Sequence, residues 1–101
     1  MYKLYVVMQI PNELVQYLKS NNLEVHVAKK LPLTRKELLD EVLSVDCDAI
    51  FCTPSITLDK ELLDLAPNLK VIGTLSVGYN HIDLKECLLR NIKVGHTPGL
   101  V

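Results

Sequence analysis

Short apolar runs alternate with amphipathic stretches along the whole chain, and no internal repeat or Gly/Ser-rich linker interrupts them. The apolar runs are rich in Val and Ile without polar alternation, which is typical of parallel strands buried on both faces. The stretches between them have the apolar spacing of helices that cover a sheet. This pattern predicts a βαβα chain with strands at residues 4–8, 23–27, 49–52, 71–75 and 92–96.

Four helices are predicted between these strands. The first is expected over residues 11–19, and the third begins near Asp59 and ends before Pro67. The second and fourth begin at Thr34 and Asp83, each of which has a Glu three residues later, the spacing of a reciprocal capping box. The apolar positions expected to face the core are Leu14, Leu18, Leu38, Leu39, Val42, Leu43, Leu62, Leu63 and Ala66.

Right-handed crossovers between five parallel strands predict an α/β, flavodoxin-like sheet of order 2-1-3-4-5 with helices on both faces. Ligands of such sheets bind beyond the carboxyl ends of the strands. The sequence stops directly after the fifth strand, before any helix that would cover it. We therefore expect a domain that is incomplete at its C-terminus and is covered by a continuation of the chain or by a partner.

The size and charge of the chain exclude several classes of function. A chain of 101 residues with 49% hydrophobic residues suits one domain, and a net charge of -1 gives no basic surface for nucleic acid. The sequence has no apolar run long enough for a membrane span and no signal peptide, so a cytoplasmic location is expected. Cys47, Cys52 and Cys87 match no common zinc spacing and are expected to be reduced, buried thiols.

The segment over residues 69–83 is the most informative part of the chain, because a strand runs into a glycine turn and then into a capped helix. Gly78 permits a positive φ, and the amides of Val77 and Gly78 could form a small nest for a carboxylate. A plain turn is the alternative, and the spacing leaves both open. Gly73 and Gly78 have P-loop spacing, but the Tyr-Asn that follows excludes a phosphate-binding lysine motif.

The sequence LKVIGTLSVGYNHIDLKECLLRNIKVGHTP, residues 69–98, resembles the end of the substrate domain in D-2-hydroxyacid dehydrogenases, and the resemblance extends over the whole chain. Its Ser-Val-Gly and Val-Gly-His-Thr-Pro forms are similar to those of glyoxylate/hydroxypyruvate reductases. The resemblance implies that the backbone amides of Val77 and Gly78, next to Ser76, hold the substrate carboxylate. It also implies that Pro54, after the third strand, approaches the ligand.

Residues needed for hydride transfer are missing from the sequence. No GxGxxG is present, so no cofactor site is expected in this chain, and NADPH or NADH would bind only to a full-length parent. The resemblance places the catalytic Arg, Glu and His beyond residue 101, so His26, His81 and His96 are expected to be structural. It implies that residues 1–101 are the N-terminal part of the substrate-binding domain, without the dinucleotide-binding domain. That part would be inactive alone and would belong to a homodimeric parent that reduces glyoxylate or hydroxypyruvate.

The loops after the first and third strands bear on other functions. A receiver domain needs acidic residues there, and a flavodoxin needs a Ser/Thr/Gly-rich phosphate loop after the first strand. Neither fits Gln9-Ile10-Pro11 and Thr53-Pro54-Ser55. A non-catalytic interaction or regulatory module, a relative that binds a full-length subunit through an uncovered face, stays open as the alternative.

Overall fold

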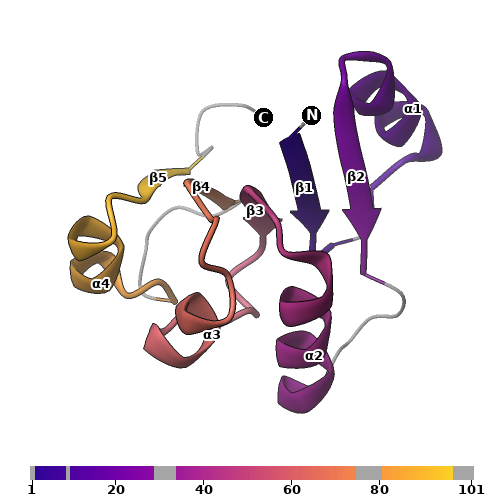
Figure 1. Cartoon of the computed structure of the whole chain (residues 1–101). Coiled ribbons are helices and arrows are strands. Elements are labelled where there is room, and N and C mark those ends of the chain that lie inside the picture. Colours follow the sequence, from indigo (N-terminus) through magenta and orange to yellow (C-terminus); the bar gives the residue numbers. More distant parts are fainter. Residues whose placement is uncertain (1, 9, 29–33, 75–80, 97–101) are drawn as a thin grey trace.

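The structure, a computed structural model, describes residues 2–8, 10–28, 34–74 and 81–96. Five parallel strands form one sheet of order β2-β1-β3-β4-β5, which confirms the predicted fold class (Figure 1). The strands match the predicted runs to within two residues, and the part of β4 expected at Leu75 lies outside the described residues. Their bounds are β1 (Tyr2–Val6), β2 (Leu23–Val27), β3 (Ala49–Cys52), β4 (Val71–Thr74) and β5 (Lys93–His96).

Helices lie on both faces of the sheet, and the alternation of side chains along β1 shows which face each one covers. Leu4 and Val6 line an apolar pocket together with Leu14 and Leu18 of the first helix. Tyr5, which lies between them in the strand, points the other way and contacts the second helix. The helices are α1 (Asn12–Ser20), α2 (Arg35–Val45), α3 (Lys60–Asp64) and α4 (Leu84–Leu89), and none of them is long and apolar enough to cross a bilayer.

The main core lies between the sheet and helices α2, α3 and α4. Five of the predicted core residues, from α2, α3 and the turn after α3, are at most 4% exposed, which confirms their assignment. They pack against side chains of β1, β3 and β4 in one continuous cluster. The five confirmed positions are Leu38, Val42, Leu62, Leu63 and Ala66.

Two predicted core positions are wrong. Leu43 is 60% exposed and Leu14 is 42% exposed, while Leu39 and Leu18 are half-buried. Leu43 follows the fully buried Val42, and the turn of about 100° per residue places it past the edge of the buried stripe of α2, on the solvent side. The apolar stripe that α2 buries is therefore narrower than the sequence suggested.

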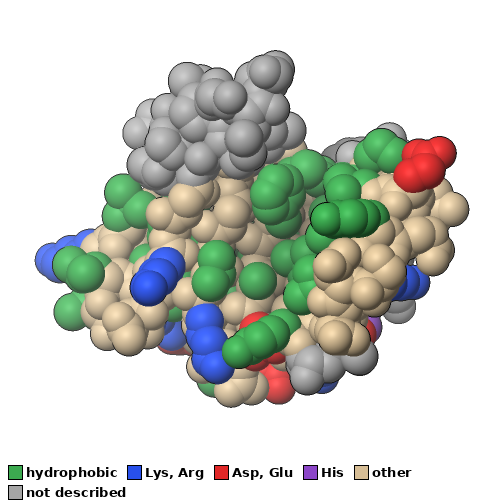
Figure 2. Space-filling view, turned by 90° about the horizontal axis from the view of Figure 1, so that it is seen from above, with side chains coloured by type: hydrophobic (Ala, Val, Ile, Leu, Met, Phe, Trp, Pro, Cys, Tyr) green, Lys and Arg blue, Asp and Glu red, His purple; other side chains and the backbone are tan. Residues whose placement is uncertain are grey.

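The face of the sheet that packs against α1 is also less buried than its apolar sequence predicted. Val71 of β4 is 46% exposed there, and Tyr2 of β1 is 62% exposed. Figure 2 shows several hydrophobic side chains at the surface on the side of the molecule that it displays. Burial of the strands on both faces, as predicted from composition, is thus incomplete within the described part of the chain.

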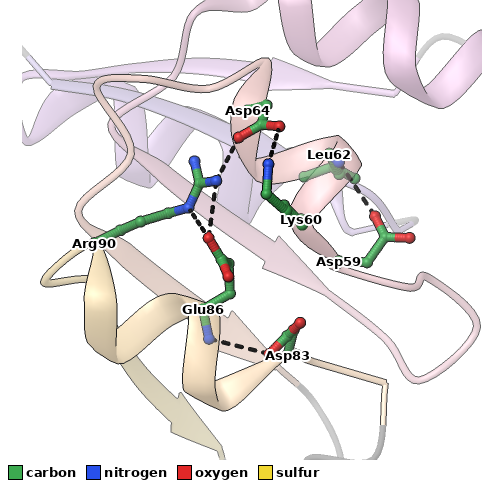
Figure 3. Close-up of polar contacts among 7 residues, drawn as sticks. All are labelled: Asp59, Lys60, Leu62, Asp64, Asp83, Glu86 and Arg90. Carbon is green, nitrogen blue, oxygen red and sulfur yellow. Dashed lines mark hydrogen bonds and ion pairs between the residues drawn. The ribbon is translucent and has the colours of Figure 1, made fainter.

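The helix starts show how local sequence sets the ends of these elements. Thr34 Oγ1 accepts from the Glu37 amide at 3.1 Å, and Glu37 Oε1 accepts from the Thr34 amide at 3.0 Å, which confirms the first capping box. Asp83 accepts from the Glu86 amide at 3.0 Å, but the Glu86 carboxylate pairs with Arg90 instead of returning to the cap (Figure 3). The second box is therefore only half formed, because a stronger charged partner is within reach of Glu86.

Replacement of the α2 cap tests how much this box stabilises the fold. We expect Thr34→Ala to lower the free energy of unfolding by about 1 kcal/mol, since it removes the acceptor for an orphan amide. Chemical denaturation measures the change. Thr57→Ala, at an exposed position that contacts Arg35 through its backbone carbonyl, is the matched control and should change stability little.

Tyr5 gives a second prediction, because its fully buried hydroxyl donates to Glu41 Oε1 at 2.7 Å. Burial, and then the hydrogen bond and charge of Glu41, raise the pKa of Tyr5 far above its usual value. The folded state therefore keeps the proton that the unfolded chain loses above about pH 10, so stability falls as pH rises through that value. Tyr5→Phe should remove the part of this alkaline loss that Tyr5 contributes, leave the part due to the buried Cys47 and Cys52 thiols, and cost about 1 kcal/mol of stability at neutral pH. Denaturation from pH 7 to 11 measures both, and Tyr17→Phe, at a 65% exposed position, should behave as the unchanged chain.

Candidate functional site

The pairing of β3 with β4 brings the two predicted substrate loops to one edge of the sheet. The strands are parallel, and their last paired residues are Cys52 and Thr74. The loop that contains Pro54 and the segment that contains residues 76–78 therefore both leave the sheet at adjacent carboxyl ends, where α/β proteins bind ligands. Of the predicted site residues, Ser76, Val77 and Gly78 lie outside the described residues, and Pro54 lies within them.

Pro54 occupies an exposed tight turn directly after β3. The Ile56 amide donates to the Thr53 carbonyl at 3.1 Å and closes the turn, and the hydroxyls of Thr53 and Ser55 are 2.7 Å apart. A groove of about 340 Å³ lies beside this turn and is lined by residues of the loop and of the start of α2, including Ser55 and Arg35. The turn thus presents Pro54 and two hydroxyls to solvent at the carboxyl edge of the sheet.

Arg35, in the first turn of α2, contacts this loop and stabilises it. Its guanidinium donates to the Thr57 carbonyl at 2.8 Å and pairs with Asp59, which also caps α3 by accepting from the Leu62 amide at 3.2 Å. Partial burial opposes ionisation of Asp59, but the hydrogen bonds from the Leu62 amide and Arg35 outweigh it and lower the pKa of that carboxyl. No local sequence signal reveals this contact, because Arg35 and Thr57 are 22 residues apart.

A second set of contacts joins the same loop to residues 81–83, which precede α4. The Leu58 amide donates to the His81 carbonyl at 2.8 Å, and the Asp83 amide donates to the Leu58 carbonyl at 2.9 Å. The His81 ring also reaches the end of β4, where its Nε2 is 2.8 Å from Thr74 Oγ1. Desolvation lowers the pKa of His81, which favours the neutral form of its ring.

Charged residues fix α3 against α4 behind these loops (Figure 3). Arg90 pairs with Asp64 of α3 and, at 3.1 Å from its Nε, with Glu86 of α4. Lys60 Nζ adds a contact to Asp64 at 3.0 Å. The hydrogen bond from Arg90, followed by that from Lys60, lowers the pKa of Asp64. These pairs link the two helices whose first turns adjoin the candidate site.

The three cysteines are buried, as predicted. Burial raises the pKa of the Cys47 and Cys52 thiols to about 11, and it raises that of Cys87 as well. A thiol that stays protonated is a poor nucleophile and a poor metal ligand. Within the described ranges, no group of His, Cys, Asp and Glu side chains is arranged to hold a metal ion. The cysteines therefore act as small apolar core residues.

The other histidine with described side-chain contacts, His26, lies apart from the candidate site. Its Nε2 is 2.7 Å from Glu24 Oε2 on β2, and it lines a cavity of about 620 Å³ together with Tyr5 and Glu41. That cavity lies beside β1, β2 and α2 rather than beside β4, and the Tyr5 hydroxyl in it is already bonded to Glu41. The structural role assigned to the histidines stays a prediction.

Comparison with known proteins decides the family. The model of the D-isomer specific 2-hydroxyacid dehydrogenase catalytic domain matches residues 4–101. The chain belongs to this family. A glyoxylate reductase of Thermofilum pendens is 44% identical over 100 residues, which cover 98% of this chain and 29% of that protein. A mouse glyoxylate reductase/hydroxypyruvate reductase is 46% identical over 71 residues, which cover 69% of this chain and 21% of that protein.

Solved structures agree with this membership. The crystal structure of the TT0316 protein from Thermus thermophilus is 36% identical and superposes with a TM-score of 0.85. The match covers 97% of this chain and 31% of the Thermus protein. This chain therefore spans less than a third of the length of these relatives, and its likeness to them extends over nearly all of its own residues.

The ionisation of His81 gives a prediction for this region. Because its pKa is lower in the folded chain than the usual 6.5, the unfolded chain binds more protons in mildly acidic solution. The stability that His81 contributes is thus complete above pH 6.5 and is lost as pH falls through its folded pKa. NMR titration should give a His81 pKa below that of an exposed histidine. His81→Gln should remove the loss between pH 6.5 and 5, and His26→Gln, the control, should leave it in place. A His81 pKa at or above 6.5 would contradict the prediction.

Proposed function

We propose that this chain binds the acid substrate in an NAD(P)H-dependent D-2-hydroxyacid dehydrogenase that reduces glyoxylate or hydroxypyruvate. Residues 1–101 form the N-terminal part of its substrate-binding domain. The backbone amides of Val77 and Gly78 hold the carboxylate of the 2-keto acid, with Ser76 beside them. Pro54 contacts the ligand from the loop after β3. The parent protein is a cytoplasmic homodimer, and the chain by itself does not turn over substrate.

The observation that carries this proposal is the parallel register of β3 and β4 in a chain of this family. It brings the Pro54 turn and the segment after Thr74 to the same edge of the sheet. The segment ends at His81, and α4 begins three residues later behind the Asp83 cap. Peptide amides between the end of a strand and a capped helix are suited to a small carboxylate, which accepts several hydrogen bonds at once. The names of the relatives from Thermofilum and mouse support glyoxylate and hydroxypyruvate as the acids.

The residues present suit only a part of the reaction of the proposed parent protein. Reduction of the keto group needs a hydride at the carbon and a proton at the oxygen, and a bound nicotinamide supplies the hydride. This chain contains no GxGxxG for that cofactor, and His81 and His26 are bonded to Thr74 and Glu24. Its part is therefore to bind and orient the acid, which lowers the entropic barrier of the reaction in the complete protein.

A non-catalytic module is the second candidate, and exposed apolar side chains on the sheet and on α4 favour it. Val71 is 46% exposed and Leu88 is 80% exposed, which would suit contact with another subunit. In this case the chain would bind a full-length dehydrogenase subunit and would change its activity without binding the keto acid itself.

An NADPH-oxidation assay with glyoxylate and hydroxypyruvate separates the two candidates. The assay compares this chain with the longest protein that its source gene encodes from Met1. Activity in the longer protein alone is the expected result, and Gly78→Ala should then raise KM for glyoxylate at least tenfold, because a Cβ at this turn interferes with close approach of the acid. Gly95→Ala is the control, since the space around Gly95 is open to a Cβ. A source gene without a longer product, or a longer product without activity, would favour the regulatory module.

A further inference from the structure

We propose that the outer edge of β2 is a self-association surface, on which β2 of a second copy of this chain pairs antiparallel to extend the sheet. β2 is an end strand, and within the described part of the chain it pairs with β1 alone (Figure 1). The free backbone groups of an end strand are a template for pairing with another chain. The inference goes beyond the proposed function, because it does not depend on the acid that the chain binds.

The pairing with β1 determines which backbone groups of β2 face outward. The Ala28 amide donates to the Val6 carbonyl at 2.9 Å. Backbone groups point alternately to the two sides of a strand, so every second residue of β2, counted back from Ala28, bonds to β1. The N–H and C=O groups of the residues between them point to the open edge. These residues are Leu23, Val25 and Val27.

A two-fold axis through Val25 makes this edge complementary to itself. In that register Val25 lies opposite its own copy, and Leu23 lies opposite Val27. Each outward N–H then meets a C=O across the axis, as in the hydrogen-bonded pairs of an antiparallel ladder. The side chains of these residues lie on the face of the sheet that packs against α1, where Val27 is 37% exposed. Cross-strand contacts between such apolar side chains stabilise a strand pair.

The polar side chains of β2 fit the same register. Glu24 of one copy lies opposite His26 of the other, at positions where the side chains of an antiparallel pair approach most closely. Within one chain His26 Nε2 is 2.7 Å from Glu24 Oε2, and the two side chains are 40% and 44% exposed. In the pair of copies each carboxylate therefore has two histidine rings as neighbours, and each ring has two carboxylates. A ring N–H donates to a carboxylate whether the histidine is neutral or charged.

The other edge of the sheet lacks this complementarity. β5 has the sequence Lys-Val-Gly-His, and a two-fold pairing of these four residues sets Lys93 opposite His96. Two positively charged groups directly opposite each other destabilise a strand pair, and Gly95 adds no side chain to it. Charge complementarity therefore selects β2, rather than β5, as the edge that pairs with a second copy.

Sedimentation equilibrium of the chain at pH 6.5 and low salt tests this interface. A pair of five-residue strands is a small contact, so we expect a weak dimer with a Kd of about 100 µM. Glu24→Lys sets a lysine opposite each histidine, and His26→Glu sets two glutamates opposite each other, so each variant alone should raise the Kd about tenfold or more. Glu61→Lys makes the same charge change on α3, at a 66% exposed side chain, and as the matched control should leave the Kd within about twofold.

An equimolar mixture of Glu24→Lys and His26→Glu is the decisive sample. In a mixed dimer each introduced charge lies opposite one of the other sign, so the mixture should recover the Kd of the unchanged chain to within about threefold. Val25→Pro is an independent test, because it removes the central outward N–H and keeps the bonds to β1, and it should leave the chain monomeric. Circular dichroism shows whether each variant is folded, and either kind of variant carries the test if the other does not fold.

Three results would overturn the proposal. The first is an unchanged chain that stays monomeric at about 1 mM. The second is a dimer that neither the charge variants nor Val25→Pro weakens, which would assign association to another surface, such as the exposed leucines of α4. The third is a mixture of the charge variants that stays monomeric while both are folded, which would exclude the antiparallel register through Val25. None of these measurements involves the acid, so their failure is separate from failure of the proposed function.

Discussion

Every part of the candidate site depends on the parallel pairing of β3 with β4. Parallel strands need a crossover between them, and α3 provides it, so both strands end at the same edge of the sheet. That edge then gathers two loops that are separated by some twenty residues of sequence. The apolar side chains of both strands, with Ile50 and Ile72 almost fully buried, hold this register, because a shift by one residue would turn them out of the core.

The loops at this edge are not independent of the core beneath them. Leu58 is a core residue, and its backbone bonds to His81 and Asp83, which precede α4. Arg35 holds the neighbouring Thr57 and Asp59 from α2. The contacts that stabilise the fold are thus the same ones that hold the loop after β3 in place.

Local sequence predicted those features that local physics controls. The Thr34 capping box and the Asp83 cap form where the spacing indicated, because each involves residues three apart. Prediction failed where neighbours compete. Glu86 pairs with Arg90 rather than with its own cap, and Leu43 turns to solvent beside the buried Val42. In both positions the residue type permits two environments, and only the packed structure selects one.

The sequence by itself determined the order of elements, the α/β class, the buried thiols and the lack of a dinucleotide motif, since periodicity, strand handedness and residue identity need no knowledge of distant contacts. The tertiary structure alone decided that Arg35 braces the loop of Thr57, that Tyr5 bonds to Glu41 36 residues away, and that His81 reaches Thr74. These are polar contacts of buried or half-buried groups. Their partners are chosen by the geometry of packing, because a polar group removed from water takes the partner that the fold places within its reach.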